Sequence, residues 1–157
     1  MTDPRYTKLA RLLVEYSIRL KKGDRVLMEV TDVPDEFAVE LMRAARRAGA
    51  LPVIEVRHSR VTREVVLDTN PRHAALIRDI ELRRMKKMQA YIAIRGSANI
   101  NETSDVPGER MALYSRAQRP VRRESAPSGT RRWLGGRSRP RLWRGWLGPH
   151  APLRTHL

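Results

Sequence analysis

The chain of 157 residues contains no cysteine and no long run of apolar residues. Without cysteine, disulfides and thiolate metal sites are excluded. No segment reaches the roughly 18 consecutive apolar residues that a membrane-spanning helix needs. The opening sequence, MTDPRYTKLARL, has no continuous apolar block behind its charges, which argues against a secretory signal. We therefore expect a cytoplasmic protein with no membrane partner.

Acidic residues and lysine are nearly missing from the last quarter of the chain. Residues 117–157 hold ten Arg, no Lys and a single acid, Glu124, a net charge of +9 out of the total of +15. The same segment has five Pro, five Gly and all three Trp, but no Ile, Asn or Asp. Neither a helical nor a strand period persists there, so too little apolar surface can be buried to offset chain entropy. We expect an irregular tail, disordered or poorly packed.

Two interpretations of this tail remain. The run RRWLGGRSRPRLWRGW combines guanidinium charge with stacking rings, the chemistry of sequence-tolerant nucleic-acid binding. The chain would then be a small basic nucleic-acid-binding protein. Alternatively, this composition is typical of G+C-rich DNA translated out of frame. We favour the second interpretation, and expect no nucleic-acid partner, because a selected basic tail usually includes lysine and some periodicity.

The first 116 residues alternate between helical and strand patterns. Short apolar runs predict three strands, and amphipathic patterns with capping residues predict the helices between them. The predicted strands are 25–30, 51–56 and 90–94, and the predicted helices are 4–20, 35–48, 59–68, 71–88 and one that starts at 108. A strand, a helix and a strand within about 30 residues form a βαβ unit. We predict an α/β fold, a partial open parallel sheet of three strands with helices on both faces.

Helical spacing predicts which side chains face the core. In the first helix these are Leu9, Leu12, Leu13, Tyr16 and Leu20. In the next two helices they are Phe37, Leu41, Ala44, Ala45 and Ala48, then Val61, Val65 and Val66.

The polar loop after the third strand is the candidate functional site. Open α/β sheets bind ligands beyond the carboxyl ends of their strands, and this loop offers Arg95, Asn99, Asn101 and Glu102. It has one glycine, Gly96, where phosphate-binding fingerprints need two or three, so nucleotide binding is unsupported. Asn, Ser and Asp also form ordinary turns. A ligand or interface role and simple turn chemistry both stay open.

Histidines and clustered acids give weaker signals. His58 follows the second strand, where a polar role is conceivable, whereas His73 fits a surface position in a helix. Neither belongs to a metal-ligand spacing, and His150 and His156 lie in the irregular tail. The acids at 32, 35 and 36, and those at 102 and 105, lie at the starts of predicted helices, where acids complement the helix dipole. We expect no catalytic residue and no metal ligand in this chain.

Three runs resemble the amino-terminal domain of the thermophilic metallo-aminopeptidases, the aminopeptidase T or leucyl aminopeptidase group. They are TKLARLLVEYSIRLKKGDRV at 7–26, TDVPDEFAVELMRAARRAGALPVIEVRHSRVTREVVLDTN at 31–70 and YIAIRGSANINETSDVPGERMALYSR at 91–116. The likeness extends to about residue 119. It implies an enzyme that releases amino-terminal residues such as leucine from peptides, with two divalent metals, zinc or cobalt, and a homodimer.

The resemblance also implies that the metal ligands lie in a later domain. We therefore divide the chain into 1–116, an incomplete amino-terminal α/β domain of an aminopeptidase, and 117–157, a tail that is disordered or out of frame. We expect no cofactor in this chain, because several carboxylate and imidazole ligands in fixed geometry are needed for a two-metal site. We expect the fragment alone to be inactive.

Overall fold

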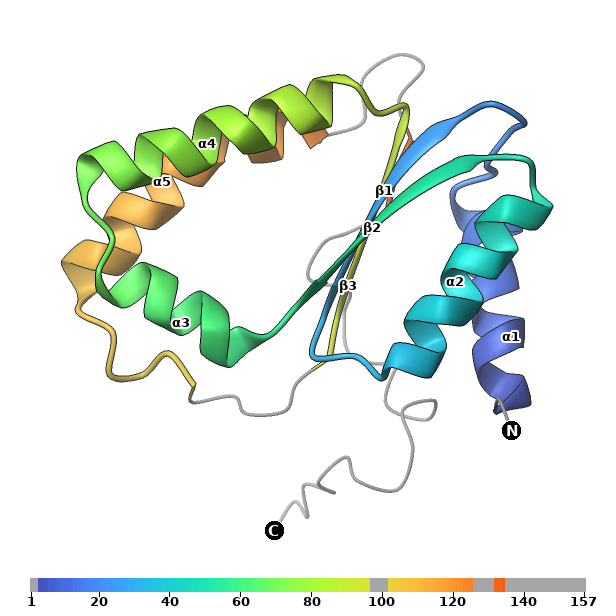
Figure 1. Cartoon of the computed structure of the whole chain (residues 1–157), viewed down its shortest axis with the longest axis horizontal. Helices are drawn as coiled ribbons and strands as arrows, with labels where there is room; N and C mark the ends of the chain where they lie inside the picture. The colour runs from blue at the N-terminus through green and yellow to red at the C-terminus, as the bar shows by residue number, and fades with distance from the viewer. Residues whose placement is uncertain (1–2, 97–101, 126–131, 135–157) are drawn as a thin grey trace, which may run out of the picture.

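The computed structural model describes residues 3–96, 102–125 and 132–134. Helices and parallel strands alternate along most of this length, as Figure 1 shows. The elements are α1 (Pro4–Arg11), the π-helix η1 (Leu12–Ser17), β1 (Arg25–Thr31), α2 (Asp35–Arg47), β2 (Leu51–Arg57), α3 (Ser59–Leu67), α4 (Pro71–Lys86), β3 (Ala90–Arg95), α5 (Gly108–Ser125) and β4 (Arg132–Leu134). Asp3 caps α1 and Asn70 caps α4, each accepting a backbone N–H of the first turn.

The sheet has the strand order β2-β1-β3-β4, and every adjacent pair is parallel. The helices α1, η1 and α2 cover one face, and α3, α4 and α5 cover the other (Figure 1). The α/β fold with helices on both faces is therefore confirmed. The chain first adds β2 on one side of β1 and then crosses to add β3 on the other side.

Side chains of β1 alternate between two different surroundings. Val26, Met28 and Val30 are fully buried in the larger hydrophobic cluster, against α1, η1 and α2. Leu27 belongs to a smaller cluster with Met85 of α4 and with α5. The larger cluster includes Phe37, Leu41, Ala44 and Ala45, so the predicted inner face of α2 is confirmed.

The predicted inner face of the first helix is partly wrong. Leu12 is 51% exposed and Tyr16 is 67% exposed, whereas Ala10, Val14 and Ile18 are buried. The buried residues recur four apart, so the inner face is centred on Ala10, Val14 and Ile18. The second half of this segment is a π-helix, in which Ile18 N–H donates to Leu13 O, five residues back, at 3.0 Å.

Two further expectations need correction. Val61 of α3 is 60% exposed, and only Val66 of the three predicted valines is fully buried. Regular structure also continues past residue 117, since α5 ends at Ser125 and β4 pairs with β3 from Ala90↔Arg132 to Ile92↔Leu134. The sheet therefore has a short fourth strand that the composition of the tail concealed. The proposed division at 116/117, as a domain boundary, stays a prediction.

Candidate functional site

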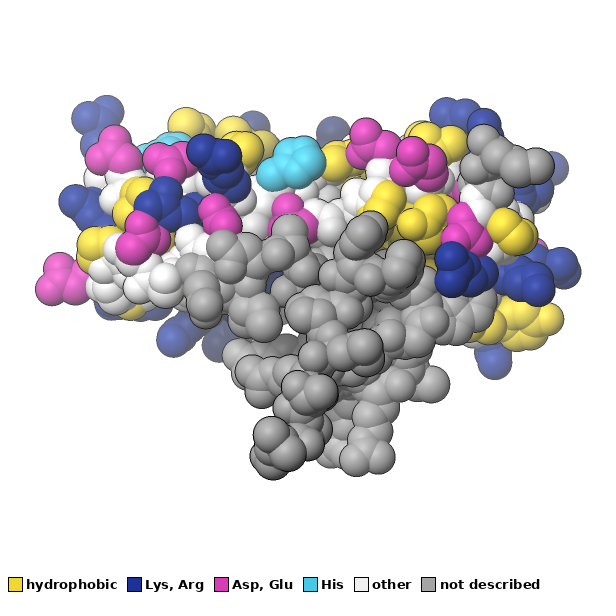
Figure 2. Space-filling model, turned by 90° about the horizontal axis from the view of Figure 1, so that it is seen from below, with side chains coloured by type: hydrophobic (Ala, Val, Ile, Leu, Met, Phe, Trp, Pro, Cys, Tyr) yellow, Lys and Arg dark blue, Asp and Glu magenta, His cyan; other side chains and the backbone are white. Residues whose placement is uncertain are grey.

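The carboxyl ends of β1, β2 and β3 meet at one edge of the sheet. Figure 2 views the molecule from this side and shows acidic, basic and histidine side chains interspersed over its described part. Arg95 ends β3 as an exposed side chain, and Glu102 is partly buried before α5. Asn99 and Asn101 lie outside the described residues. The ligand or interface role of this loop therefore stays a prediction.

The backbones of Asp32 and Gly96 lie close together at this edge. Gly96 N–H donates to Thr31 O at 2.8 Å. A Cβ at position 96 would lie 2.0 Å from the carbonyl oxygen of Asp32, so only glycine fits there. Asp32 itself has φ of 50°, a conformation that aspartate tolerates better than most residues. The single glycine of the loop thus serves packing between β1 and β3.

The carboxylate of Asp32 caps the start of α3. Its Oδ1 accepts the Ser59 N–H at 3.1 Å, and its Oδ2 accepts the Ser59 hydroxyl. His58 is 64% exposed, and its Nδ1 lies 3.9 Å from Asp32 Oδ1. Because both oxygens of Asp32 already accept hydrogen bonds, this group is a structural cap. His73, the other histidine singled out, lies in the first turn of α4 and donates its backbone N–H to Asn70 Oδ1 at 3.0 Å.

Acids before α2 and α5 have separate structural roles. Asp35 and Glu36 occupy the first turn of α2, as the capping interpretation predicted. Asp105 instead accepts the Arg63 Nε–H at 2.9 Å and pairs with the same guanidinium through its second oxygen. That contact holds the pKa of Asp105 below its ordinary value. It fastens the segment before α5 to α3.

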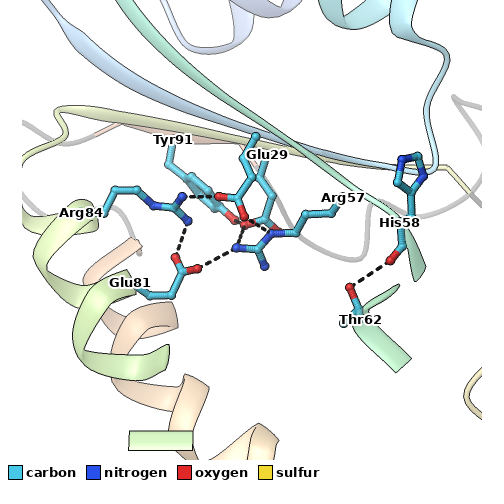
Figure 3. Close-up of polar contacts among 8 residues, drawn as sticks. Glu29, Arg57, His58, Thr62, Glu81, Arg84 and Tyr91 are labelled. Carbon is cyan, nitrogen blue, oxygen red and sulfur yellow. Dashed lines mark hydrogen bonds and ion pairs between the residues drawn. The ribbon is translucent and has the colours of Figure 1, made fainter. Parts of the chain in front are cut away.

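A second group of charged side chains lies between the sheet and α4 (Figure 3). We name this set the ionic cluster; it consists of Glu29, Glu55, Arg57, Glu81, Arg84 and Tyr91. Arg57 is its centre. Its guanidinium lies 2.7 Å from Glu55, 2.8 Å from Glu81 and 3.6 Å from Glu29. Arg84 binds Glu55 and Glu81 from α4.

Burial and charge oppose each other within the ionic cluster. Burial by itself would raise the pKa of Glu55, but hydrogen bonds and charge from Arg57 and Arg84 outweigh burial and lower it. Burial, together with the neighbouring Glu29, raises the pKa of Tyr91, whose hydroxyl donates to Glu29 Oε2 at 3.2 Å. Tyr91 is therefore a neutral hydrogen-bond donor over the ordinary pH range.

Sequence reasoning missed the ionic cluster, although a signal was present. Glu29 interrupts the apolar run of β1, and Glu55 interrupts that of β2. Their strand positions correspond in the β1–β2 register, where Glu29 lies beside Glu55. Acids inside strands that are covered on both faces require cationic partners. Two such acids in neighbouring strands could have predicted a buried ion-pair network.

The donor groups do not fit a divalent metal. Among the residues that the structure describes, no group of three or more His, Asp or Glu side chains could hold one. The carboxylates that do cluster are bound by Arg57 and Arg84, whose positive charges oppose a cation. No described helix is long and apolar enough to cross a membrane.

Comparison with known proteins identifies a family and a solved structure of similar fold. Residues 2–134 match the family of thermophilic metalloproteases (M29). The fold resembles that of the wild-type AmpT of Thermus thermophilus, with a TM-score of 0.61 and 20% sequence identity. The match covers 78% of this chain and 32% of the AmpT chain, so the present chain spans about a third of that protein. No curated protein matches the sequence.

Proposed function

The chain belongs to the thermophilic metalloprotease (M29) family, and we propose that it is an amino-terminal fragment of a metal-dependent aminopeptidase. The match over residues 2–134 carries this proposal. The longer enzyme would release amino-terminal residues such as leucine from peptides, using two divalent ions of zinc or cobalt. It would act in the cytoplasm as a homodimer. The described part of the chain supplies the α/β framework.

We further propose that the 157-residue chain is inactive by itself. The reason is the chemistry of its carboxylates. A two-metal peptidase needs carboxylate and imidazole ligands free to hold ions about 4 Å apart. In the described residues, Asp32 caps α3, and Glu29, Glu55 and Glu81 surround Arg57.

The test is an assay of the pure chain with a leucine-linked chromogenic substrate, with and without zinc or cobalt. We expect no metal-dependent turnover. Equilibrium dialysis of the same sample against each metal should leave less than stoichiometric metal on the protein. Turnover that appears with the metal and disappears with a chelator would refute the proposed inactivity.

The origin of the tail is tested on the gene. Translation of the other two frames beyond codon 116 should give a continuation with strand-like runs and metal-binding carboxylates if residues 117–157 are out of frame. Failure to find one in either frame contradicts the out-of-frame interpretation, while leaving the family assignment intact.

A further inference from the structure

The outer edge of β2 carries backbone hydrogen-bonding groups that have no partner among the described residues. The parallel register points the N–H and C=O groups of alternate residues toward β1. Leu51 N–H donates to Asp24 O at 2.8 Å, and Arg57 O accepts from Asp32 N–H at 3.0 Å. The intervening residues therefore turn their backbone groups away from the sheet. They are Pro52, Ile54, Val56 and, just beyond the strand, His58.

This edge is complementary to itself in one register. Pro52 has no N–H to donate, and the His58 carbonyl already accepts Thr62 N–H at 3.0 Å and Thr62 Oγ1–H at 3.1 Å. An antiparallel copy, related by a twofold axis at Glu55, places Pro52 opposite His58 of the second copy. Pro52, which has no N–H, then faces the His58 carbonyl, which already accepts two hydrogen bonds from Thr62. The free His58 N–H faces the Pro52 carbonyl.

The remaining groups pair fully in the same register. Ile54 lies opposite Val56 of the second copy, and the two residues exchange both backbone hydrogen bonds. An axis at Ile54 would instead set Pro52 against Val56, whose carbonyl would lose its donor. An axis at Val56 would set Ile54 N–H against the occupied His58 carbonyl. The positions of one proline and one helix cap thus select a single register.

The side chains of this edge also favour burial. Leu51, Val53 and Val56 are 58%, 44% and 43% exposed. Exposed edge strands are commonly protected by charge or proline, and here Pro52 blocks only one outward donor. Glu55 would lie opposite Glu55 of the second copy, and Arg57 and Arg84 already compensate each carboxylate.

We propose that two copies of this chain join through the outer edges of β2 into one continuous sheet, with antiparallel β2 strands and a twofold axis at Glu55. The pairing depends on this strand alone, so it forms whether or not the chain is part of a peptidase.

The first test measures mass. Light scattering of the full 157-residue chain should give twice the chain mass of 18.1 kDa. Val56→Lys places a charge against Ile54 of the second copy and should raise the dimer dissociation constant at least about tenfold. The matched control is Val39→Lys, since Val39 is 46% exposed but lies on α2. A monomeric parent chain, or equal effects of the two substitutions, would overturn the proposal.

The second test fixes the register by cross-linking, which the cysteine-free sequence makes clean. Residues at the axis of such a pair have Cα atoms about 4.5 Å apart, within the range that a disulfide spans. Glu55→Cys should therefore form a covalent dimer under mild oxidation. Val53→Cys faces Arg57 of the second copy and should not. Equal cross-linking at both positions contradicts this register; circular dichroism checks that each variant is folded.

Discussion

Replacing Arg57 by methionine tests whether the ionic cluster stabilises the fold. The substitution removes the guanidinium that lies among Glu29, Glu55 and Glu81. Arg84 still binds Glu55 and Glu81. Glu29 would lose its cationic partner. Its side chain is only 11% exposed, and among its described partners only the Tyr91 hydroxyl would remain.

The expected loss follows from the cost of leaving a buried carboxylate without its cation. Breaking a buried ion pair from one side costs about 3–5 kcal/mol. Arg57 is 25% exposed, so water screens part of this effect and about 2–4 kcal/mol is expected. With an m-value of about 1.5 kcal/mol/M, a loss of about 3 kcal/mol lowers the urea midpoint by about 2 M.

The assay is urea unfolding followed by far-ultraviolet circular dichroism at neutral and acidic pH. The pKa of Glu55 in the folded chain is below its ordinary value. Ionised Glu55 therefore stabilises the folded state at pH values above the ordinary pKa of a glutamate. This stabilisation is lost as the pH falls through the lowered pKa, so the difference between parent and variant should shrink in acid. The control is Arg60→Met on α3, where the arginine is exposed. The reasoning fails if both substitutions cost the same at neutral pH, or if the Arg57→Met deficit grows in acid.

Three smaller predictions concern the carboxyl edge. Gly96→Ala places a Cβ only 2.0 Å from Asp32 O, so the backbone must shift. We expect a cost of about 3 kcal/mol, which lowers the melting temperature by about 6–12 °C. The control Gly108→Ala adds a Cβ with nothing within 4 Å and should change the melting temperature little. Asp32→Ala removes the cap of α3 and should cost about 1–2 kcal/mol in urea unfolding, whereas Asp32→Asn should recover most of that loss; equal losses contradict the capping role. Asp105→Asn should leave the urea midpoint almost unchanged at moderate salt, since its pair with Arg63 is exposed; a clear fall in the midpoint would show that this surface contact stabilises the fold.

Local sequence patterns predicted the strands within a residue or so. Each strand is a short apolar run with a clear stop, and β1, β2 and β3 begin at the predicted residues, Arg25, Leu51 and Ala90. Proline and capping residues likewise located the starts of α1 and α4. These signals are local, so a single sequence contains them in full.

Features set by tertiary packing could not be predicted in the same way. The first helical segment has apolar side chains on more than one side, and packing buries Ala10, Val14 and Ile18 while Leu12 and Tyr16 are exposed. The sequence places Gly96 in a candidate ligand loop, whereas its role in the fold depends on the end of β1, which lies beside it. The strand β4 has only three residues, too few for a periodic signal, and 36 residues separate it from β3, with which it pairs.

The arrangement of charge explains why this part of the chain is a framework. Arginine stays protonated at any pH at which the protein folds, and the carboxylates around Arg57 raise its pKa further, outweighing the opposing effect of burial. Raising the pH therefore does not free those carboxylates by discharging Arg57, and a metal ion would have to displace a fixed cation. Both carboxylate oxygens of Asp32 accept hydrogen bonds from Ser59 of α3. The carboxylates of the described residues at these two places therefore hold elements of the α/β fold together, through Ser59 of α3 and through Arg57 and Arg84.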